Sequence, residues 1–454
     1  MSPAASARWA GVVMAAGQGV RMKSRIPKVL HKLCGKELAR YPVELLQSLG
    51  ISKIVVVVSP HNADAVRALL GGQVEYAVQP AVLGTGDALG RAETLLRGQA
   101  DHVLVQGGDA PLVRRETLER LMACHLEESN QMTLLSATGV VTQDLGRLLR
   151  DDQGRVVDIV EAKHWQGQGQ APAEVNAGVY CFDSPWLWRN LARVEPSPGG
   201  ERYLTTLVSL GAAGGARVQG VVTDDPSEAL GINNRVQLAQ LEAIQQQRIR
   251  ERWMLAGVTI TDPASTYIDA EVNIGQDTVI LPNTHLQGKT SIGSDCTVGP
   301  GSVVRDTRVG DRCRITASVL EESTVEDEVD IGPFSHLRPG AYLECHVHIG
   351  NYVEVKNSRL GAGTASGHFS YLGDATIGEK VNIGAGTITC NYDGKNKLET
   401  HIGAGAFIGC DTMLVAPVTV GEDAKTGAGA VVTKDVPPGK LAVGVPARVR
   451  EKGE

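Results

Sequence analysis

The sequence predicts an α/β domain followed by a parallel β-helix. In the first half, short apolar runs alternate with helix-like segments, and in the second half apolar residues recur at every sixth position. Between the halves, residues 233–256 lack proline and glycine and place apolar side chains near helical spacing, namely Val236, Leu241, Ile244 and Ile249. We therefore expect a first domain over residues 1–230, a connecting helix over 231–256 and a second domain over 257–454.

Chain length, net charge and cysteine count each exclude some classes of protein. A chain of 454 residues is long enough for two or three domains, and its net charge of -7 argues against the broad basic surface that nucleic-acid binding needs. Its eight cysteines form no CxxC pair, which favours a reducing, cytoplasmic compartment over a disulfide framework. No apolar run approaches the roughly 18 residues of a membrane-spanning helix. We expect small-molecule ligands, with no nucleic acid and no stable membrane insertion.

The first apolar run, RWAGVVMAA (8–16), has two interpretations. A cation ahead of an apolar stretch is typical of a signal peptide, but this stretch is short and a basic, glycine-containing loop follows it. We expect a buried strand instead. Further strands are predicted at KIVVVVS, HVLVQGG and VNAGVYCF, and helices at PVELLQSLG, ADAVRALL and RETLERLMACHLEE. This alternation favours a sheet of parallel strands with ligands at their carboxyl ends.

Beyond residue 257 the period is six. Apolar anchors precede glycine in segments such as IGQDTV, IGSDCT and IGAGAF, which is the hexapeptide signature of a left-handed parallel β-helix whose anchors point inward. The segment CNYDGKNKLETH (390–401) breaks the repeat, and we expect it to leave the coil as a loop that forms a binding wall. The expected anchors are Ile274, Ile280, Leu286, Ile292, Val298, Val304, Val319, Val325, Ile331, Leu337, Leu343, Ile349, Val355, Ile402, Ile408, Leu414, Val420, Thr426 and Val432.

The segment that ends the first strand, MAAGQGVRMKSRIPKVL (14–30), combines glycines with four cations, Arg21, Lys23, Arg25 and Lys28. It lacks the third glycine of a dinucleotide fingerprint and the Gly-Lys-Ser/Thr of a P-loop. Exposed backbone N–H groups from Ala15 to Gly19, together with Arg21 and Lys28, can surround a triphosphate. The alternative is a solvated basic loop without a ligand.

This loop resembles the sugar nucleotidyltransferase signature, and with the β-helix the chain resembles the bifunctional N-acetylglucosamine-1-phosphate uridyltransferase/glucosamine-1-phosphate N-acetyltransferase family. The resemblance extends over nearly the whole chain through QPAVLGTGDAL, GGDAPL, IVEAK, VNAGVY, GINNRVQL, LRPGA, VEVKNSRLG, GHFSYLGDA and NIGAGTITCNYDG. It implies a Rossmann-like nucleotidyltransferase domain, a β-helix acetyltransferase domain and a homotrimer. It also implies UTP and acetyl-CoA as co-substrates and Mg²⁺ as cofactor.

In the first domain, the resemblance implies a site for UTP and a sugar phosphate, with Lys28 and Asp109 as catalytic residues. Asp109 and Asn233 would hold Mg²⁺, which prefers such oxygen ligands; as isolated residues they fit a turn and a helix cap equally well. The loop QPAVLGTGDA could read a uracil edge or be an ordinary turn. The implied nucleotide- and sugar-phosphate-binding residues are Met14, Ala15, Ala16, Gly17, Lys28, Gln79, Gly84, Thr85, Gly146, Glu161, Asn176 and Asn233.

In the second domain, His368 corresponds to the family's general base, which takes a proton from the glucosamine amine as that amine attacks the acetyl-CoA thioester. A histidine suits this role because its pKa lies near neutrality, although a lone histidine is more often structural. The resemblance implies that Arg338, Lys356, Tyr371 and Asn382 bind the amino-sugar phosphate, although the two cations alone would be surface charges. It implies that acetyl-CoA is bound by Ala385, Asn391, Tyr392, Cys410 and Ala428, of which Asn391 and Tyr392 also match sugar-binding positions.

The implied enzyme acetylates glucosamine-1-phosphate and then transfers UMP from UTP, giving UDP-N-acetylglucosamine for cell-wall and peptidoglycan synthesis. Two alternatives stay open: a sugar-1-phosphate nucleotidyltransferase with a non-acetylating β-helix, and a β-helix that is a structural scaffold or regulatory binding module. A galactosamine substrate is also open. The motif ECHVH (344–348) suggests a metal, but its alternation fits a strand. The chain departs from the family at Val20, Gly107 and Cys410, and near Gly444, where the family's arginine is missing although Arg448 follows.

Overall fold

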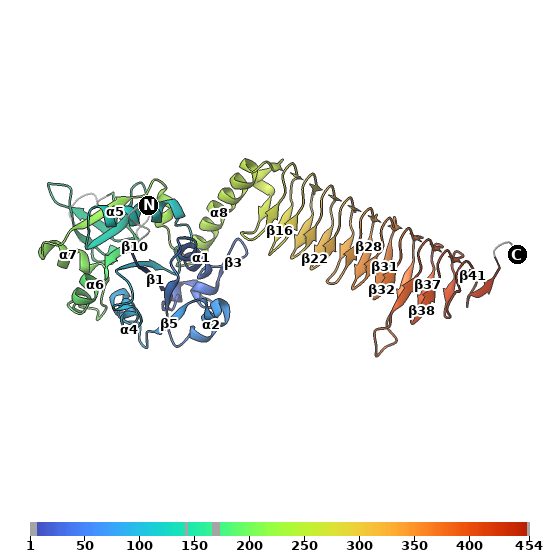
Figure 1. Cartoon of the computed structure of the whole chain (residues 1–454), viewed down its shortest axis with the longest axis horizontal. Coiled ribbons are helices and arrows are strands. Elements are labelled where there is room, and N and C mark those ends of the chain that lie inside the picture. Colours follow the sequence, from blue (N-terminus) through green and yellow to red (C-terminus); the bar gives the residue numbers. More distant parts are fainter. Residues whose placement is uncertain (1–6, 141–143, 166–172, 452–454) are drawn as a thin grey trace. The chain divides into compact units, whose positions relative to one another are not determined.

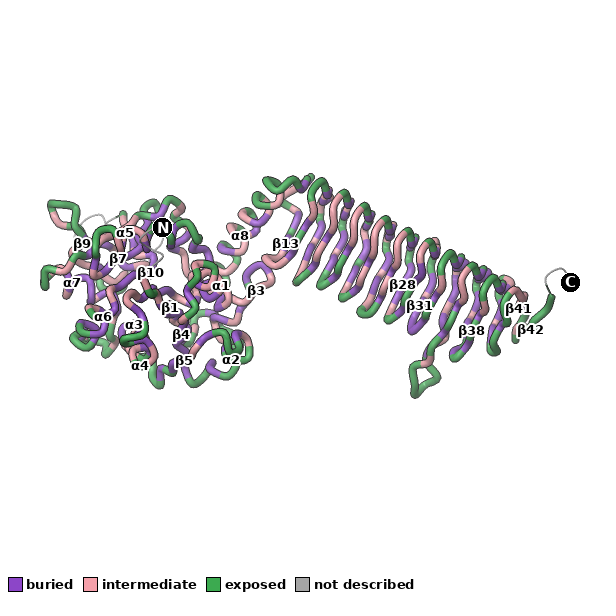
Figure 2. The backbone as a smooth tube through the Cα atoms, viewed as in Figure 1, coloured by how far each residue is buried: buried purple, intermediate pink, exposed green. Residues whose placement is uncertain are grey.

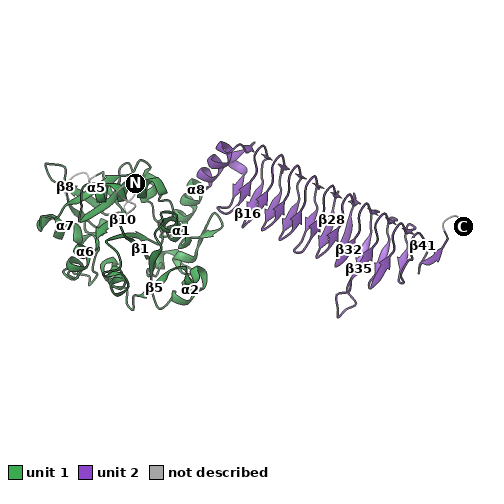
Figure 3. Ribbon diagram, in the orientation of Figure 1, with its two compact units in different colours: residues 1–245 green, residues 246–454 purple. Residues whose placement is uncertain are grey.

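The computed structural model describes residues 7–140, 144–165 and 173–451. The chain folds as two compact units, residues 1–245 and 246–454 (Figure 3). Helix α8 (Arg235–Leu255) lies in the segment expected to connect the domains and contributes to both units. Leu241 and Ile249 of this helix are buried, whereas Val236 is exposed. Within the described segments, no helix has the length and apolar character needed to cross a membrane.

The first unit is built on a nine-stranded sheet whose continuous path is β11-β7-β10-β6-β1-β4-β5 (Figure 1). Helices cover both faces of the sheet, so strands such as KIVVVV are buried on both sides. The strands on the path are β11 (Val218–Val222), β7 (Met132–Ala137), β10 (Val175–Asp183), β6 (His102–Gly107), β1 (Trp9–Met14), β4 (Lys53–Val58) and β5 (Glu75–Val78). Beside β10 lie the paired strands β8 (Arg147–Arg150) and β9 (Val156–Val160).

Two sets of helices enclose the sheet. The core on one face includes apolar residues from α1 (Arg40–Ser48), α2 (Ala63–Leu70) and α5 (Arg115–Glu127). The core on the other face includes residues from α3 (Thr85–Gly90), α4 (Glu93–Leu96), α6 (Ser184–Leu191) and α7 (Thr206–Ala213). The run RWAGVVMAA supplies the buried strand β1, as expected.

The sheet contains the expected parallel strands, but β10 departs from this arrangement. This strand is antiparallel to both of its neighbours, β6 and β7, whereas β1 is parallel to β4 and β6. The chain reaches β10 from β7 through the antiparallel pair β8–β9 and not through a crossover helix, so it enters the sheet in the reverse direction.

The second unit confirms the predicted parallel β-helix. Strands three apart in the sequence pair in parallel and form three walls. The first wall runs from β12 (Thr259–Ile260) to β41 (Leu441–Val443) and ends with the antiparallel strand β42 (Arg448–Arg450). The second runs from β13 (Tyr267–Ile268) to β40 (Val431–Val432), and the third from β14 (Asn273–Ile274) to β38 (Val418–Val420). Buried and exposed residues alternate along each coil (Figure 2).

One expected anchor of the β-helix is wrong. Val319 is 37 % exposed, and its neighbour Leu320 is fully buried instead. The coil advances by five residues from the anchor Ile315 to Leu320 because the corner between them is one residue short, so the expected period of six slips here. Every other expected anchor is buried.

The segment 390–401 leaves the coil as expected. It connects β34 (Ile388–Cys390) to β35 (Thr400–Ile402) and projects from the stack of coils (Figure 1). A bridge between Tyr392 and Lys397 closes the loop on itself. Its first residue beyond β34, Asn391, is buried against the coil.

Candidate functional sites

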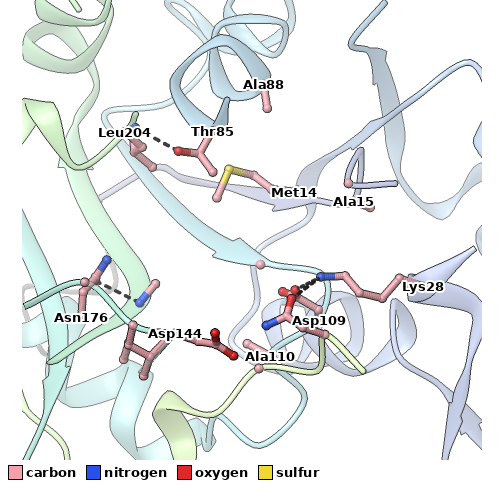
Figure 4. A pocket seen from close by; sticks show the side chains of 18 of the residues that line it. Met14, Ala15, Lys28, Thr85, Ala88, Asp109, Ala110, Asp144, Asn176 and Leu204 are labelled. Carbon is pink, nitrogen blue, oxygen red and sulfur yellow. Dashed lines mark hydrogen bonds and ion pairs between the residues drawn. The ribbon is translucent and has the colours of Figure 1, made fainter. Parts of the chain in front are cut away.

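A pocket of about 700 Å³ lies in the first unit at the carboxyl ends of β1 and β6 (Figure 4). Residues from segments far apart in the sequence line it. They include Asp109 and all twelve residues that the sequence analysis assigns to nucleotide and sugar phosphate: Met14, Ala15, Ala16, Gly17, Lys28, Gln79, Gly84, Thr85, Gly146, Glu161, Asn176 and Asn233.

The glycine loop brings Lys28 into this pocket. Gly19 has a φ of 61°, and a Cβ there would lie 2.6 Å from the Cβ of Lys28, so only glycine allows this close approach. Lys28 is the first residue of the short 3₁₀ helix η3 (Lys28–Leu30). Its side chain is 12 % exposed. Close packing of the loop thus fixes the base of the lysine.

Both cations expected in the phosphate cradle line the pocket, but one of the expected backbone N–H groups is already paired. Of the four cations in the loop, Lys28 and Arg21 line the pocket, whereas Lys23 and Arg25 are exposed and do not. The N–H of Ala15 donates a 2.8 Å hydrogen bond to the carbonyl of Val57, so it is not free for a phosphate as expected. The sequence pattern could not show this because β1 pairs with β4 in register only in the folded sheet.

Lys28 joins the two expected metal ligands. Its Nζ contacts Oδ2 of Asp109 (Figure 4). It also donates a 3.3 Å hydrogen bond to Oδ1 of Asn233. Asp109 follows β6, and Asn233 precedes α8. A carboxylate oxygen and an amide oxygen therefore meet at one cation, and this is the type of oxygen set that Mg²⁺ takes.

The residues expected to bind the sugar are held by neighbours that sequence reasoning missed. Oε1 of Glu161 accepts a 2.7 Å hydrogen bond from the hydroxyl of Thr205. Nδ2 of Asn176 donates a 2.6 Å hydrogen bond to the hydroxyl of Tyr180, and burial raises the pKa of that tyrosine. Thr205 and Tyr180 line the same pocket, together with Asp144 and Tyr203. The segment around Thr205 carried no motif that would have identified it.

The loop QPAVLGTGDA is ordered by its own polar groups. Nε2 of Gln79 donates hydrogen bonds to the carbonyl of Gly84, at 3.1 Å, and to Asp87, at 2.9 Å. The N–H of Leu204 donates a 2.9 Å hydrogen bond to the hydroxyl of Thr85. Gly84 has a φ of 96°, and a Cβ there would lie 2.4 Å from the carbonyl oxygen of Arg202. The amide nitrogen of Gln79 therefore shapes the loop and is not free to read a base.

A second group of expected site residues lies on the β-helix. Leu337 pairs with Val355, so Arg338 and Lys356 are neighbours on consecutive coils. Nη1 of Arg338 donates a 2.7 Å hydrogen bond to Glu354, and Nζ of Lys356 lies 3.5 Å from Oδ2 of Asp374. Both cations keep exposed area and stand side by side, a spacing suited to one anionic group.

Asp374 is a further residue that sequence reasoning missed. Besides Lys356, it accepts a 2.7 Å hydrogen bond from Nδ2 of Asn357 and another from Nδ2 of Asn391. Nδ2 of Asn391 also lies 3.3 Å from the hydroxyl of Tyr371. Burial acts to raise the pKa of Asp374, but these hydrogen bonds and the charge of Lys356 outweigh it, so the pKa is lowered. The carboxylate thus connects Asn391, at the start of the projecting loop, to Lys356.

Four expected site residues form a column along one corner of the β-helix. His368, Ala385, Cys410 and Ala428 each stand two positions after an inward anchor of the first wall. The anchors Ser366, Ile383 and Ile408 pair from coil to coil. His368 and Cys410 are exposed. Asn382 lies on β33 (Asn382–Ile383) of the same wall, whereas Tyr371 lies on β31 (Ser370–Gly373) of the second wall.

Side chains of the segment ECHVH contact charged side chains of neighbouring coils. Glu344 pairs with Arg359, His346 Nδ1 lies 3.1 Å from Glu328, and His348 Nδ1 lies 3.1 Å from Asp330. Among the described residues, no group of three or more histidines, cysteines or acidic side chains is arranged to hold a metal ion.

Comparisons with known proteins agree with this two-part architecture. The model of the MobA-like NTP transferase domain matches residues 11–252, and that of the bacterial transferase hexapeptide repeat matches residues 271–306 and 399–434. The proteins named "Bifunctional protein GlmU" from Geobacillus sp. (strain WCH70) and Halalkalibacterium halodurans are 45% and 43% identical to this chain. Each alignment covers 97% of this chain, with 95% and 96% of the relative, respectively. A third protein with this name, from Brevibacillus brevis, is 44% identical to this chain, and the alignment covers 95% of this chain and 94% of the relative.

The chain belongs to the bifunctional GlmU family.

Within this family, the departures noted in the sequence fall at distinct places. Val20 is 76 % exposed. A Cβ at Gly107 would lie 2.6 Å from Oδ1 of Asp109, so any side chain at this position requires the carboxylate to shift. Arg448 lies on β42, which pairs with β41 at the end of the first wall. The departure at Gly107 is thus the one that bears on the pocket.

Proposed function

We propose that this GlmU-family protein acetylates glucosamine-1-phosphate with acetyl-CoA in its second unit and transfers UMP from UTP to the product in its first unit. The observation that carries the proposal is the convergence of thirteen expected residues on one pocket, together with the column that begins at His368. Family membership over nearly the whole chain supports both activities.

In the first unit, an oxygen of N-acetylglucosamine-1-phosphate attacks the α-phosphorus of UTP, and pyrophosphate leaves. Lys28 and Arg21 neutralise phosphate charge, while Glu161 and Asn176 hold the sugar through hydrogen bonds. Asp109 and Asn233 would hold Mg²⁺, because their oxygens already meet at one cation. When bound, the metal ion supplies further neutralisation of phosphate charge.

In the second unit, the amine of glucosamine-1-phosphate attacks the thioester carbonyl of acetyl-CoA. His368 takes a proton from the amine, the C–S bond breaks, and coenzyme A leaves as its thiol. Arg338 and Lys356 bind the sugar phosphate, with Tyr371 and Asn382 on the sugar. The corner formed by Ala385, Cys410 and Ala428, with Asn391 and Tyr392, receives acetyl-CoA. Family resemblance supports a homotrimer, in which neighbouring coils enclose the coenzyme, and a cytoplasmic location.

A substrate panel tests the proposal. The full chain is incubated with amino-sugar phosphates and nucleoside triphosphates, while thiol release and pyrophosphate release are followed in parallel. We expect thiol from acetyl-CoA with glucosamine-1-phosphate and pyrophosphate from UTP with its acetylated product. Pyrophosphate without thiol for any amino sugar would favour a nucleotidyltransferase with a non-acetylating β-helix. Higher rates with galactosamine derivatives than with glucosamine derivatives would show that galactosamine-1-phosphate is the substrate.

A further inference from the structure

The ammonium group of Lys28 lies where the expected metal ligands meet. It contacts Oδ2 of Asp109 and lies 3.3 Å from Oδ1 of Asn233. The lysine side chain is only 12 % exposed and that of Asp109 29 %, so the pair is partly withdrawn from solvent. Because both of these oxygens already accept from the ammonium group, a metal ion bound to them would lie close to the positive charge of Lys28.

We propose that Lys28 competes with the divalent cation for Asp109 and Asn233, and that nucleotide binding relieves the competition by giving the ammonium group a phosphate partner. This inference rests on the proposed uridyltransferase function. Two positive charges on one carboxylate repel each other, and an ammonium group displaced without a new partner would be buried and unpaired. The nucleotide and the metal ion should therefore bind with positive coupling, each tightening the other by the same factor.

The pocket offers Lys28 few other partners in the absence of nucleotide. The other acidic residues that line it are already paired: Asp144 with Arg21, Glu161 with Thr205, and Glu201 with Lys163. Lys28 can therefore leave Asp109 most easily for an incoming anion. A triphosphate supplies that anion within the same pocket.

Mn²⁺ binding to the full chain tests this competition without any turnover. Free Mn²⁺ is measured by electron paramagnetic resonance, with and without a UTP analogue whose α,β-bridging oxygen is replaced by methylene, and the Mn²⁺ that the analogue binds by itself is measured in a titration without protein and subtracted. For the natural chain we expect the Mn²⁺ Kd to fall about tenfold or more when the analogue is present. For Lys28→Met and for Lys28→Gln, we expect a fall of about tenfold without the analogue, because the competing charge is gone.

Two further variants test whether the gain in Mn²⁺ affinity arises at Asp109. Lys53→Met removes another lysine of the first unit, one that pairs with Glu75 and does not line the pocket, and it should leave the Mn²⁺ Kd unchanged. Asp109→Asn added to Lys28→Met should abolish the gain in affinity. The expected result for Lys28→Met is tighter binding, which a misfolded variant cannot imitate.

Unchanged or weaker Mn²⁺ binding by folded Lys28→Met without nucleotide would overturn the proposal, because Lys28 and the metal ion would then share the site. A gain that survives in the double variant would also overturn it. Failure of the proposed function is a separate result, because it appears as missing pyrophosphate release, whereas the competition is read from Mn²⁺ binding alone.

Discussion

The hydroxyl of Tyr180 accepts a 2.6 Å hydrogen bond from Nδ2 of Asn176, while Oδ1 of Asn176 accepts a 3.0 Å hydrogen bond from the N–H of Gly178. Tyr180 is 3 % exposed, and its ring is part of the core behind the pocket. The side chain of Asn176 is therefore held in one orientation by a residue of the core. If Asn176 binds the sugar as proposed, Tyr180 is a positioning residue for that site.

We expect Tyr180→Phe to lower kcat/KM for N-acetylglucosamine-1-phosphate about 5- to 20-fold. The change removes one hydrogen-bond partner of Asn176, a loss of about 1–2 kcal/mol. Steady-state kinetics should show the KM for UTP nearly unchanged. Tyr76→Phe, which loses a hydrogen bond to Gly71 outside the pocket, is the matched control. An equal rise of KM for both substrates would instead indicate general damage to the pocket.

Substitution of one histidine should slow acetyl transfer and leave uridyl transfer unchanged. We expect His368→Ala to slow thiol release from acetyl-CoA about 10²- to 10⁴-fold, because it removes the proposed general base, and to leave pyrophosphate release from UTP unchanged. The control is His346→Ala, which removes a histidine paired with Glu328 on the same β-helix. Normal acetyl transfer by His368→Ala would exclude its role as the base.

Asp374→Asn tests the carboxylate that connects Lys356 with Asn391. An amide has one acceptor oxygen and no charge, so it cannot serve the three donors that meet there. We expect the KM for glucosamine-1-phosphate to rise about tenfold, equivalent to about 1.4 kcal/mol, with uridyl transfer unaffected. Asp435→Asn, at an exposed aspartate of the β-helix, should have no effect. The idea fails if the two variants behave alike.

Alkylation should report on the column that begins at His368. All eight cysteines lie in the described part of the chain, and of these only Cys410 is exposed. We expect N-ethylmaleimide to block acetyl transfer and to spare uridyl transfer, because the added group fills the expected acetyl-CoA corner. Cys410→Ala should remain active and resist the reagent. Equal inactivation of Cys410→Ala would show that another thiol is responsible.

His125 predicts a dependence of stability on pH. Burial, followed by the nearby His102, lowers the pKa of His125 to about 3, and its ring nitrogens contact Thr133 and His102. The unfolded chain, with an ordinary histidine pKa near 6.5, binds the proton more readily than the folded one between these two values. The free energy of unfolding therefore falls as pH decreases from about 6.5 to about 3, by up to about 1.4 kcal/mol per pH unit.

Urea unfolding of the full chain, followed by tryptophan fluorescence at several pH values, measures this slope. We expect His125→Gln to be less stable at neutral pH but to lose stability less steeply on acidification than the natural chain. His164→Gln, at an exposed histidine, should keep the natural slope. Parallel curves for His125→Gln and the natural chain would assign the acid sensitivity to the carboxylates.

Local sequence patterns predict some features of this fold and not others, because some depend on contacts between distant residues. The sixfold period predicted the β-helix because inward anchors recur locally, yet it missed the short corner before Leu320. Apolar runs predicted the strands of the first unit, but not that β10 is antiparallel, because strand direction depends on the path of the chain between strands. Motifs identified Glu161 and Asn176 as candidates. They gave no role to Tyr180, although it ends the motif VNAGVY, and none to Thr205, because the roles of both depend on contacts made in the folded protein.

The sequence alone determined the two repeating patterns, and with them the two-part fold and the family. Only the tertiary structure decided which polar groups meet. Lys28 reaches Asp109 and Asn233 across 81 and 205 residues of chain, and Asp374 joins Lys356 to Asn391 from different coils. Local periodicity records which face of a strand or helix is buried. Partners far apart in the chain are set by strand order and register, which no short stretch of sequence contains.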